Sequence, residues 1–329
     1  MGWRKRNMTR HLVADAANFQ LEPKFNLLKA IRGCCTVVVA LLLASGPILA
    51  ADSPVIAPGA KLEVLGEGYP YAYGLAADRD GNVFFTDQFS DRIVKWNAFD
   101  GTFSDWLTPS GFSKGLYFEK TGKLLVTAVE KGELWSITPD KVVTVLATNF
   151  GGKQFNGPND LWISPDGGVY FTDPYYRTTF LIRDPNARMA GQHVYFMAPD
   201  RKTVTQVTTD LSYPYGIIGT TDGKVLYVGD IVGQTTWAFD IRPGGELTNK
   251  RLFYDRSSEG MAIDVEGNVY LTRNGVTVLD KTGKRIEQID LPTGITTDVT
   301  FGGKDRNLLF ITTTDRYVYG LKMGVKGVD

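Results

Sequence analysis

The sequence contains few residues of the two types that most often carry thiol, imidazole or zinc chemistry. Its 329 residues include two cysteines, Cys34 and Cys35, and two histidines, His11 and His193. A zinc site built from several histidines is therefore excluded. His193 lies in the alternating segment GQHVYFM, which is typical of an outer strand. We interpret it as a structural histidine rather than as the base of a Ser-His-Asp triad.

An excess of charge of either sign is also missing. Lys and Arg together number 36, as do Asp and Glu, so the formal net charge is zero, and the body of the chain has no basic block. A nucleic-acid partner is not expected, because phosphate binding depends on clustered positive charge. The hydrophobic share of 43% is that of an ordinary folded protein, which argues against disorder.

The N-terminal segment has the composition of an export signal. Basic residues outnumber acidic ones in positions 1–32, and an uncharged apolar run follows from Gly33 to Ala51. We expect residues 1–50 to be removed as a signal peptide, leaving residues 51–329 as a periplasmic or secreted domain. The alternative is an uncleaved membrane anchor, because the apolar run approaches the ~18 residues that a spanning helix needs. Cleavage would remove both cysteines, and with them any disulfide or thiol nucleophile.

Glycine and aromatic residues are abundant, and they fall into a repeat. Glycine numbers 36 and aromatic residues make up 12% of the chain. One phrase recurs six times: a short apolar strand, a turn of the Asp-Gly, Glu-Gly or Thr-Gly kind, and a second β-rich strand. The copies are GLAADRDGNVFFTD from Gly74, GLYFEKTGKLLVTA from Gly115, DLWISPDGGVYFTD from Asp160, GIIGTTDGKVLYVGD from Gly216, GMAIDVEGNVYLTR from Gly260 and the looser DVTFGGKDRNLLFITTT from Asp298.

This repeat predicts an all-β fold, a six-bladed β-propeller with four antiparallel strands in each blade. The spacing of the copies, 38 to 56 residues, is close to the length of one propeller blade. The sixth unit lacks a fourth strand, while the strand-like segment 61–68 stands spare before the first unit. We therefore predict that this N-terminal strand completes the last blade and closes the ring. An all-β sandwich is the alternative, but a sandwich does not require this period.

In a propeller, the residues that precede the innermost strands meet at one mouth of the central channel. Here those residues are Tyr73, Lys114, Asn159, Tyr215, Glu259 and Thr297, and the ends of the second strands add Asp87, Asp173, Asp230 and Arg273. Carboxylate and amide oxygens without histidine or thiol favour a hard cation such as Ca²⁺ or Mg²⁺. The neighbouring tyrosines either stack on a sugar face or plug the channel, and the sequence leaves both interpretations open.

The segment GKQFNGPNDLWISPDGGVYFTDPYY (152–176) resembles the signature segment of the senescence marker protein/gluconolactonase family. The likeness continues through YPYGIIGTTDGKVLYVGDI, EGMAIDVEGNVYLTRNGVTVLDKTGKRI and TTDVTFGGKDRNLLFITT, and it extends from about residue 60 to the end of the chain. The resemblance implies a six-bladed propeller that hydrolyses sugar lactones or related cyclic esters with one divalent cation in the channel.

The resemblance also implies roles for individual residues. Asp230 matches the family's metal ligand and proposed base, and Asn159 matches a residue near the metal and the substrate. Two ligand positions depart from the family, because its Glu is Tyr73 here and its Asn is Tyr215. Neutral tyrosine hydroxyls are poor Ca²⁺ ligands, so the cation is expected to bind weakly.

The remaining residues complete the expected site. Glu259 is expected to compensate in part as a third metal ligand, beside Asp230 and Asn159. Lys114 and Arg273 are expected to hold an anionic substrate or to stabilise the oxyanion, with Tyr73 and Tyr215 also lining the substrate site. Ca²⁺ is the first choice of metal, with Mg²⁺, Mn²⁺ or Zn²⁺ as the other candidates.

The sequence thus predicts an exported, metal-assisted hydrolase of a sugar lactone or related cyclic ester. Its partner is a small-molecule lactone, and no stable membrane insertion is expected once the signal is removed. The long segment 173–192 between two strands of the third unit is interpreted as a lid over the channel mouth. The alternative, from another class of protein, is a non-catalytic propeller that binds a carbohydrate or a protein partner.

Mass spectrometry of the protein isolated from its native host tests the export prediction. Cleavage after Ala50 gives a mature N-terminus at or near Ala51 in the envelope or medium fraction. An intact N-terminus retained in the membrane fraction would contradict cleavage and support the anchor.

Overall fold

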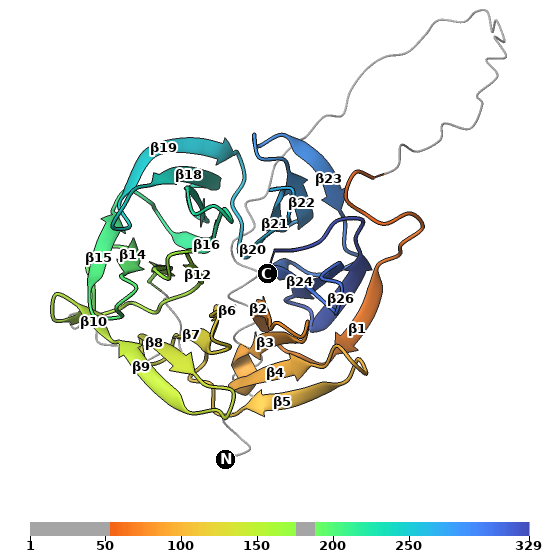
Figure 1. The fold of residues 1–329 in the computed structure, drawn as a ribbon, viewed down its shortest axis with the longest axis horizontal. Coiled ribbons are helices and arrows are strands. Elements are labelled where there is room, and N and C mark those ends of the chain that lie inside the picture. Colours follow the sequence, from red (N-terminus) through yellow and green to blue (C-terminus); the bar gives the residue numbers. More distant parts are fainter. Residues whose placement is uncertain (1–52, 176–187, 329) are drawn as a thin grey trace, which may run out of the picture. The chain divides into compact units, whose positions relative to one another are not determined.

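Six four-stranded antiparallel sheets are arranged around a central axis in the computed structural model, which describes residues 53–175 and 188–328 (Figure 1). The predicted six-bladed β-propeller is therefore confirmed. The expected signal peptide and most of the expected lid lie outside the described residues. In the part that is described, the one helix is a 3-10 turn, η1 (Gln88–Ser90), and no helix is long and apolar enough to cross a membrane.

Each blade runs from an innermost strand at the axis to an exposed outer strand. The first three blades are β2 (Ala72–Ala77), β3 (Val83–Asp87), β4 (Arg92–Trp96) and β5 (Phe103–Leu107); β6 (Leu116–Phe118), β7 (Leu124–Ala128), β8 (Glu133–Ile137) and β9 (Val143–Ala147); and β12 (Leu161–Ile163), β13 (Val169–Asp173), β14 (His193–Met197) and β15 (Val204–Thr208). A short hairpin, β10 (Asn149–Phe150) and β11 (Lys153–Gln154), joins the second blade to the third.

The remaining blades follow the same order. They are β16 (Pro214–Gly219), β17 (Val225–Asp230), β18 (Thr235–Ile241) and β19 (Leu247–Tyr254); β20 (Met261–Ile263), β21 (Val269–Arg273), β22 (Gly275–Leu279) and β23 (Arg285–Ile289); and β24 (Thr296–Gly302), β25 (Leu308–Thr313) and β26 (Tyr317–Lys322) with β1 (Glu63–Glu67) as the fourth strand. The turns that the sequence placed between first and second strands lie where they were predicted.

The N-terminal strand closes the ring, as predicted. β1 pairs with β26 in antiparallel register, from Glu63 opposite Gly320 to Glu67 opposite Tyr317. The chain before β1 adds a second tie, because the Gly324 N–H donates to the Val55 carbonyl at 2.8 Å. The two ends of the described chain therefore hold the last blade together, and the outer edge of β26 is not left unpaired.

The core lies between the blades, because each sheet packs both of its faces against its neighbours. The second strands show this most clearly, since all five residues of β3, β7 and β13 are buried. Aromatic side chains fill the wedges between blades, as where Phe155 meets Phe171 edge to face with ring centroids 5.2 Å apart. Outer strands such as β9 are more exposed, and β9 keeps apolar residues such as Val143 and Val145 on its exposed part.

Glycine at the start of the innermost strand allows adjacent blades to approach closely at the axis. A Cβ added to Gly74 would lie 1.7 Å from the Lys114 carbonyl oxygen, and one added to Gly216 would lie 2.6 Å from the Glu259 carbonyl oxygen. In both cases the contacted residue is the one that precedes the next repeat. The recurring glycine thus places the channel residue of the following blade against the strand.

This contact predicts a large loss of stability for Gly74→Ala. Gly74 and Gly122 both have positive φ, but a Cβ at Gly122 would meet no atom within 4 Å. Gly122→Ala therefore costs about 1–2 kcal/mol for its backbone conformation alone, whereas Gly74→Ala adds a clash with the backbone of the next blade. Chemical denaturation of both variants measures the difference. Equal losses of unfolding free energy would show that the close approach is unimportant.

Candidate functional site

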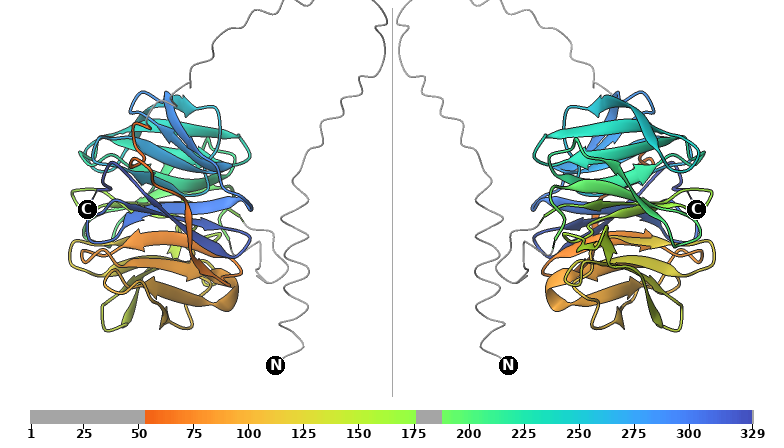
Figure 2. Two further views of the ribbon diagram at one scale, coloured as in Figure 1. Left: turned by 90° about the vertical axis from the view of Figure 1, so that its right-hand side faces the viewer. Right: turned by 90° about the vertical axis from the view of Figure 1, so that its left-hand side faces the viewer.

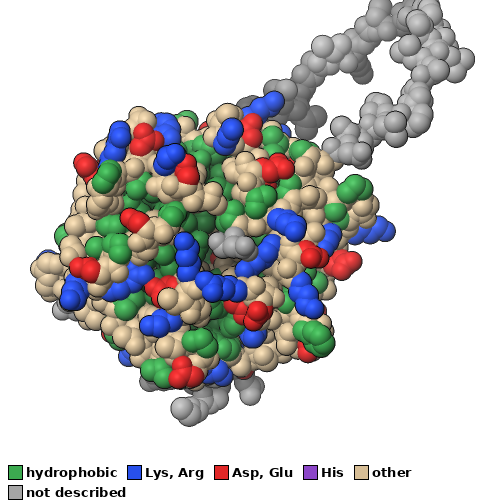
Figure 3. Space-filling view, in the orientation of Figure 1, with side chains coloured by type: hydrophobic (Ala, Val, Ile, Leu, Met, Phe, Trp, Pro, Cys, Tyr) green, Lys and Arg blue, Asp and Glu red, His purple; other side chains and the backbone are tan. Residues whose placement is uncertain are grey.

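The candidate site lies at the end of the channel opposite the C-terminus. The C-terminal segment binds the turns between first and second strands, where the Val265 N–H donates to the Lys326 carbonyl at 2.9 Å. Figure 2 shows the C-terminus on that face of the ring. In the space-filling view of this face, Lys and Arg side chains are interspersed with Asp and Glu (Figure 3). The residues that precede the innermost strands are at the other end of the same strands.

A buried lysine surrounded by tyrosines occupies the channel. The Lys114 side chain, from the second blade, is 3% exposed, and its Nζ lies 4.5 Å from the ring centroid of Tyr73 and 4.7 Å from that of Tyr215. The ammonium also donates a hydrogen bond to the Tyr215 hydroxyl at 2.5 Å. The rings of Tyr73 and Tyr215 meet edge to face with centroids 6.0 Å apart, so tyrosines of the first and fourth blades contact each other across the channel.

Two more tyrosines extend this cluster. Tyr71 stacks on Tyr73 with centroids 6.3 Å apart, and Tyr213 stacks on Tyr215 at 5.9 Å. Lys114 Nζ also lies 5.5 Å from the Tyr71 ring centroid. Aromatic faces stabilise a cation that has been removed from water. The rings of Tyr71, Tyr73 and Tyr215 therefore surround the ammonium, and together with Tyr213 behind them we call these residues the tyrosine cage.

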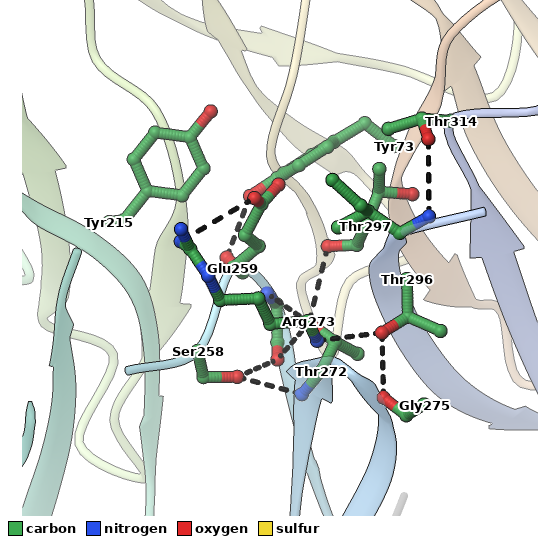
Figure 4. A network of polar contacts seen from close by, with 12 residues as sticks. Tyr73, Tyr215, Ser258, Glu259, Thr272, Arg273, Gly275, Thr296, Thr297 and Thr314 are labelled. Carbon is green, nitrogen blue, oxygen red and sulfur yellow. Dashed lines mark hydrogen bonds and ion pairs between the residues drawn. The ribbon is translucent and has the colours of Figure 1, made fainter. Parts of the chain in front are cut away.

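Glu259 and Arg273 lie beside the cage. A guanidinium nitrogen of Arg273 is 3.9 Å from a carboxylate oxygen of Glu259, and the two side chains are 37% and 16% exposed (Figure 4). The Tyr73 hydroxyl donates to the Glu259 backbone carbonyl at 2.6 Å. Glu259 and Arg273 are thus more accessible than Lys114 and Tyr73, and they form the rim of the channel.

The backbone of Arg273 adopts a conformation that is rare for a residue with a side chain. Its φ is +132°, and its N–H donates to the Thr296 hydroxyl at 2.6 Å. Thr296 in turn donates to the Gly275 carbonyl, also at 2.6 Å (Figure 4). Such a conformation costs about 1–3 kcal/mol and is found mostly at functional sites. The two hydrogen bonds hold the end of β21 in this strained conformation, beside which the guanidinium lies 3.9 Å from Glu259.

Burial shifts the ionisation of the channel groups. It lowers the pKa of the Lys114 ammonium to about 8, although the negative charges of Glu259 and Asp160 oppose this shift. It also raises the pKa of the Glu259 carboxyl, which the positive charges of Lys114 and Arg273 oppose. A carboxyl with a raised pKa is a better proton acceptor than an ordinary surface carboxylate.

Two further carboxyl groups, for which no role was expected, are buried near the channel. Asp160 and Asp298 replace glycine at the first position of the third and sixth repeats. Asp160 accepts the N–H of Ile217 in the next blade at 3.2 Å, and Asp298 accepts the N–H of Leu75 at 2.6 Å. Burial raises the pKa of Asp160 to about 7, and burial together with the charge of Asp160 raises that of Asp298 well above its usual value. Both groups join adjacent blades.

Asp230, which was expected to bind metal and to act as the base, is engaged elsewhere. Its two carboxylate oxygens accept the N–H groups of Ser212 and Tyr213, each at 2.8 Å. Asp173, at the same position in the third blade, accepts the N–H groups of Asn156 and Gly157 at 2.9 and 2.7 Å. The arrangement recurs because an aspartate at the end of the second strand holds the loop that enters its own blade. It favours a structural role for Asp230.

The remaining predicted residues are also located by the structure. Asn159 is fully buried, and its carbonyl accepts the Gly115 N–H at 2.8 Å and the Thr127 hydroxyl at 2.9 Å. Of the predicted site residues, those that the contacts above bring together are Lys114, Tyr73, Tyr215, Glu259 and Arg273. His193 is buried, with Nε2 2.9 Å from the Ala190 carbonyl oxygen, which agrees with a structural histidine.

The donor set does not fit the divalent cation that the family implies. Calcium takes six to eight oxygen ligands, with carboxylates among them. Here the Glu259 carboxylate is flanked by Arg273, the Tyr215 hydroxyl is bound to Lys114, and the Tyr73 hydroxyl is bound to a carbonyl. Within residues 53–175 and 188–328, no three His, Cys, Asp or Glu side chains are grouped so that they could hold a metal. The ligand set Asp230, Asn159 and Glu259 stays a prediction, and within it both carboxylate oxygens of Asp230 already accept backbone N–H groups.

The chain belongs to the SMP-30/Gluconolactonase/LRE-like region family, whose sequence model matches residues 65–315. It is 28% identical to a gluconolactonase of Zymomonas mobilis over 242 residues, which cover 65% of this chain and 67% of the relative. The solved structure of a gluconolactonase from Xanthomonas campestris is 26% identical, has a TM-score of 0.72 and is matched over 83% of this chain and 95% of its own.

A more distant solved structure shares the fold. It is that of regucalcin, described as a calcium-binding protein, from Agrobacterium tumefaciens, which is 20% identical with a TM-score of 0.68. The match covers 80% of this chain and 94% of that structure. The predicted family is thus confirmed, and its relatives include proteins named for lactone hydrolysis.

Proposed function

We propose that this protein hydrolyses a lactone or a related cyclic ester at the rim of its channel. Membership of the family and the similarity to gluconolactonases support the reaction class. The observation that carries the proposal is the convergence of a carboxylate with a raised pKa, Glu259, on a strained arginine and a lysine-bound tyrosine. We also propose, from the sequence of residues 1–51 alone, that the protein acts in the periplasm or is secreted.

In this proposal Glu259 is the proton acceptor. Water attacks the carbonyl carbon of the lactone, and the Glu259 carboxylate takes the proton that the water loses. Arg273, which is fixed beside Glu259, binds an anionic group of the substrate or of the acid product. The ring of Tyr213, which packs on Tyr215, is the aromatic group on which the substrate ring can stack. A divalent cation would polarise the carbonyl as a Lewis acid, but these residues do not fit one, and no step depends on it.

One observation favours the second candidate function, a propeller that binds a carbohydrate or protein partner without catalysis. Tyr73 is fully buried and Tyr215 is 7% exposed, so the tyrosine cage fills the channel instead of leaving it open. A filled channel leaves ligand contacts to the rim, around Glu259, Arg273 and the exposed part of Tyr215. Such a site suffices for binding even when nothing is hydrolysed.

Hydrolysis of a panel of sugar lactones and simple cyclic esters, followed by pH-stat, tests the proposed function. We expect turnover by the wild type and a loss of about 10²–10⁴-fold in kcat for Glu259→Gln, which keeps the shape but removes the proton acceptor. Asp230→Asn is the matched carboxylate variant. We expect it to lower the unfolding free energy by about 1–3 kcal/mol, because a buried N–H loses its acceptor, while the folded protein keeps its kcat within a few-fold.

Two results would contradict this account. If folded Asp230→Asn is inactive and Glu259→Gln is active, the base is Asp230, as the family resemblance implied. If the wild type hydrolyses no member of the panel, with or without added metal, the protein belongs to the binding class.

A further inference from the structure

The tyrosine cage contains a cation that belongs to the chain itself. We propose that the ammonium of Lys114, acting through the hydroxyl of Tyr215, supplies the positive charge that polarises the substrate carbonyl, so that the channel functions without a divalent cation. This inference rests on the proposed function for its chemistry. The second part of the inference, that the channel binds no divalent cation, does not depend on the proposed function. It can be tested on the protein without any substrate.

The first observation is the position of the ammonium. Lys114 comes from the second blade, yet its Nζ lies within 5 Å of ring centroids from the first and the fourth blades, those of Tyr73 and Tyr215. The side chain therefore spans the channel instead of folding back onto its own blade. An ammonium removed from water needs such compensation, and here three rings, one hydroxyl and the negative charges of Glu259 and Asp160 provide it.

The second observation is what this arrangement does to a metal ion. A divalent cation coordinated by Glu259 would lie close to both the ammonium and the Arg273 guanidinium, and like charges in a poorly hydrated site repel strongly. The tyrosines at positions 73 and 215 also direct their hydroxyls to partners within the protein. The positions where the family resemblance implies Glu and Asn ligands thus serve here to hold a lysine.

The third observation concerns the hydroxyl of Tyr215. Lys114 donates to its oxygen, which draws electron density from the O–H bond and makes the hydroxyl a stronger donor. Tyr71 borders the same group, because Lys114 Nζ lies 5.5 Å from its ring centroid. Tyr213 stacks on the Tyr215 ring and fixes its orientation. A substrate carbonyl that accepts from the Tyr215 hydroxyl would receive a short, charge-assisted hydrogen bond.

The reaction then balances with water as the one co-reactant. The water oxygen bonds to the carbonyl carbon, its proton passes to Glu259, and the carbonyl electron pair moves onto oxygen, where the Tyr215 hydroxyl stabilises it. The ring C–O bond breaks as the carbonyl re-forms, and the leaving oxygen takes the proton from Glu259. The product is the open hydroxy acid. Tyr215 is the group that touches the reacting oxygen, whereas Lys114 polarises and positions it.

Calorimetric titration of the full-length protein with CaCl₂ and with MnCl₂ tests the statement about metal. We expect no binding by the wild type up to millimolar metal, and no change in its rate after EDTA treatment or on adding metal. Stoichiometric binding at micromolar metal, or a rate that EDTA abolishes and Ca²⁺ restores, would overturn the inference.

Three substitutions test the Lys114–Tyr215 pair by their kinetics. Tyr215→Phe keeps the ring and removes the donor, so we expect kcat to fall about 10²–10³-fold, as on loss of an oxyanion donor, with KM changed less than about threefold. Lys114→Met should lower kcat similarly, and Lys114→Arg should recover part of the loss. Tyr254→Phe on outer strand β19 and Lys224→Met on the opposite face are the matched controls. Wild-type kcat in folded Tyr215→Phe would overturn the inference.

Variants designed to gain Ca²⁺ binding test, without any measurement of turnover, whether Lys114 excludes metal. Tyr73→Glu with Tyr215→Asn installs the oxygen ligands that the family resemblance implies, and adding Lys114→Met removes the fixed charge. We expect the triple variant to bind Ca²⁺ at least tenfold more tightly than the double variant. Equal affinity would show that Lys114 does not exclude metal. If the wild type hydrolyses no lactone, the proposed function fails, but these titrations still decide whether Lys114 takes the place of the cation.

Discussion

Blades are bound to their neighbours by a contact from the second strand of one blade to the residue that precedes the next repeat. This contact holds the ring together and places the residues of the channel. A buried threonine of the second strand donates its hydroxyl to the carbonyl of the residue that precedes the following repeat, as in Thr127 to Asn159 at 2.9 Å and Thr172 to Tyr215 at 2.6 Å. Where the fourth blade has Gly229 in place of threonine, the backbone of Ser258 approaches instead. Each channel residue is thus fixed by its backbone, and its side chain is free to vary. This explains how the channel side chains can differ from blade to blade on one scaffold.

The fold was predictable because the same pattern of strand, turn and strand recurs six times in the sequence. Each copy carries its own turn and its own strand periodicity, and the spare strand at 61–68 had one vacant partner, β26. The membership of the site was also predictable in part. Tyr73, Lys114, Tyr215 and Glu259 share one position in the repeat, so they had to meet at the axis.

The roles within the site were less predictable, since they depend on where a side chain finds its hydrogen bonds. Asp230 shares its position with Asp87 and Asp173, and this recurrence was the signal of a structural role. Asp160 and Asp298 differ from the glycine of the other repeats, and that departure was the signal of a special environment. The direction of Lys114 had no signal in the sequence, because a lysine before an innermost strand can point to solvent as easily as across the channel.

Side chains of the protein bring charges of both signs to the channel. Lys114 and Arg273 face Glu259, and the carboxyls of Asp160 and Asp298 lie buried nearby. A crystal structure of the protein soaked in MnCl₂, with anomalous data collected at the manganese edge, examines this balance most directly. The account predicts no anomalous peak in the channel, with Lys114 Nζ bound to the Tyr215 hydroxyl. A peak between Glu259 and Asn159, with Lys114 displaced from the tyrosine cage, would contradict it.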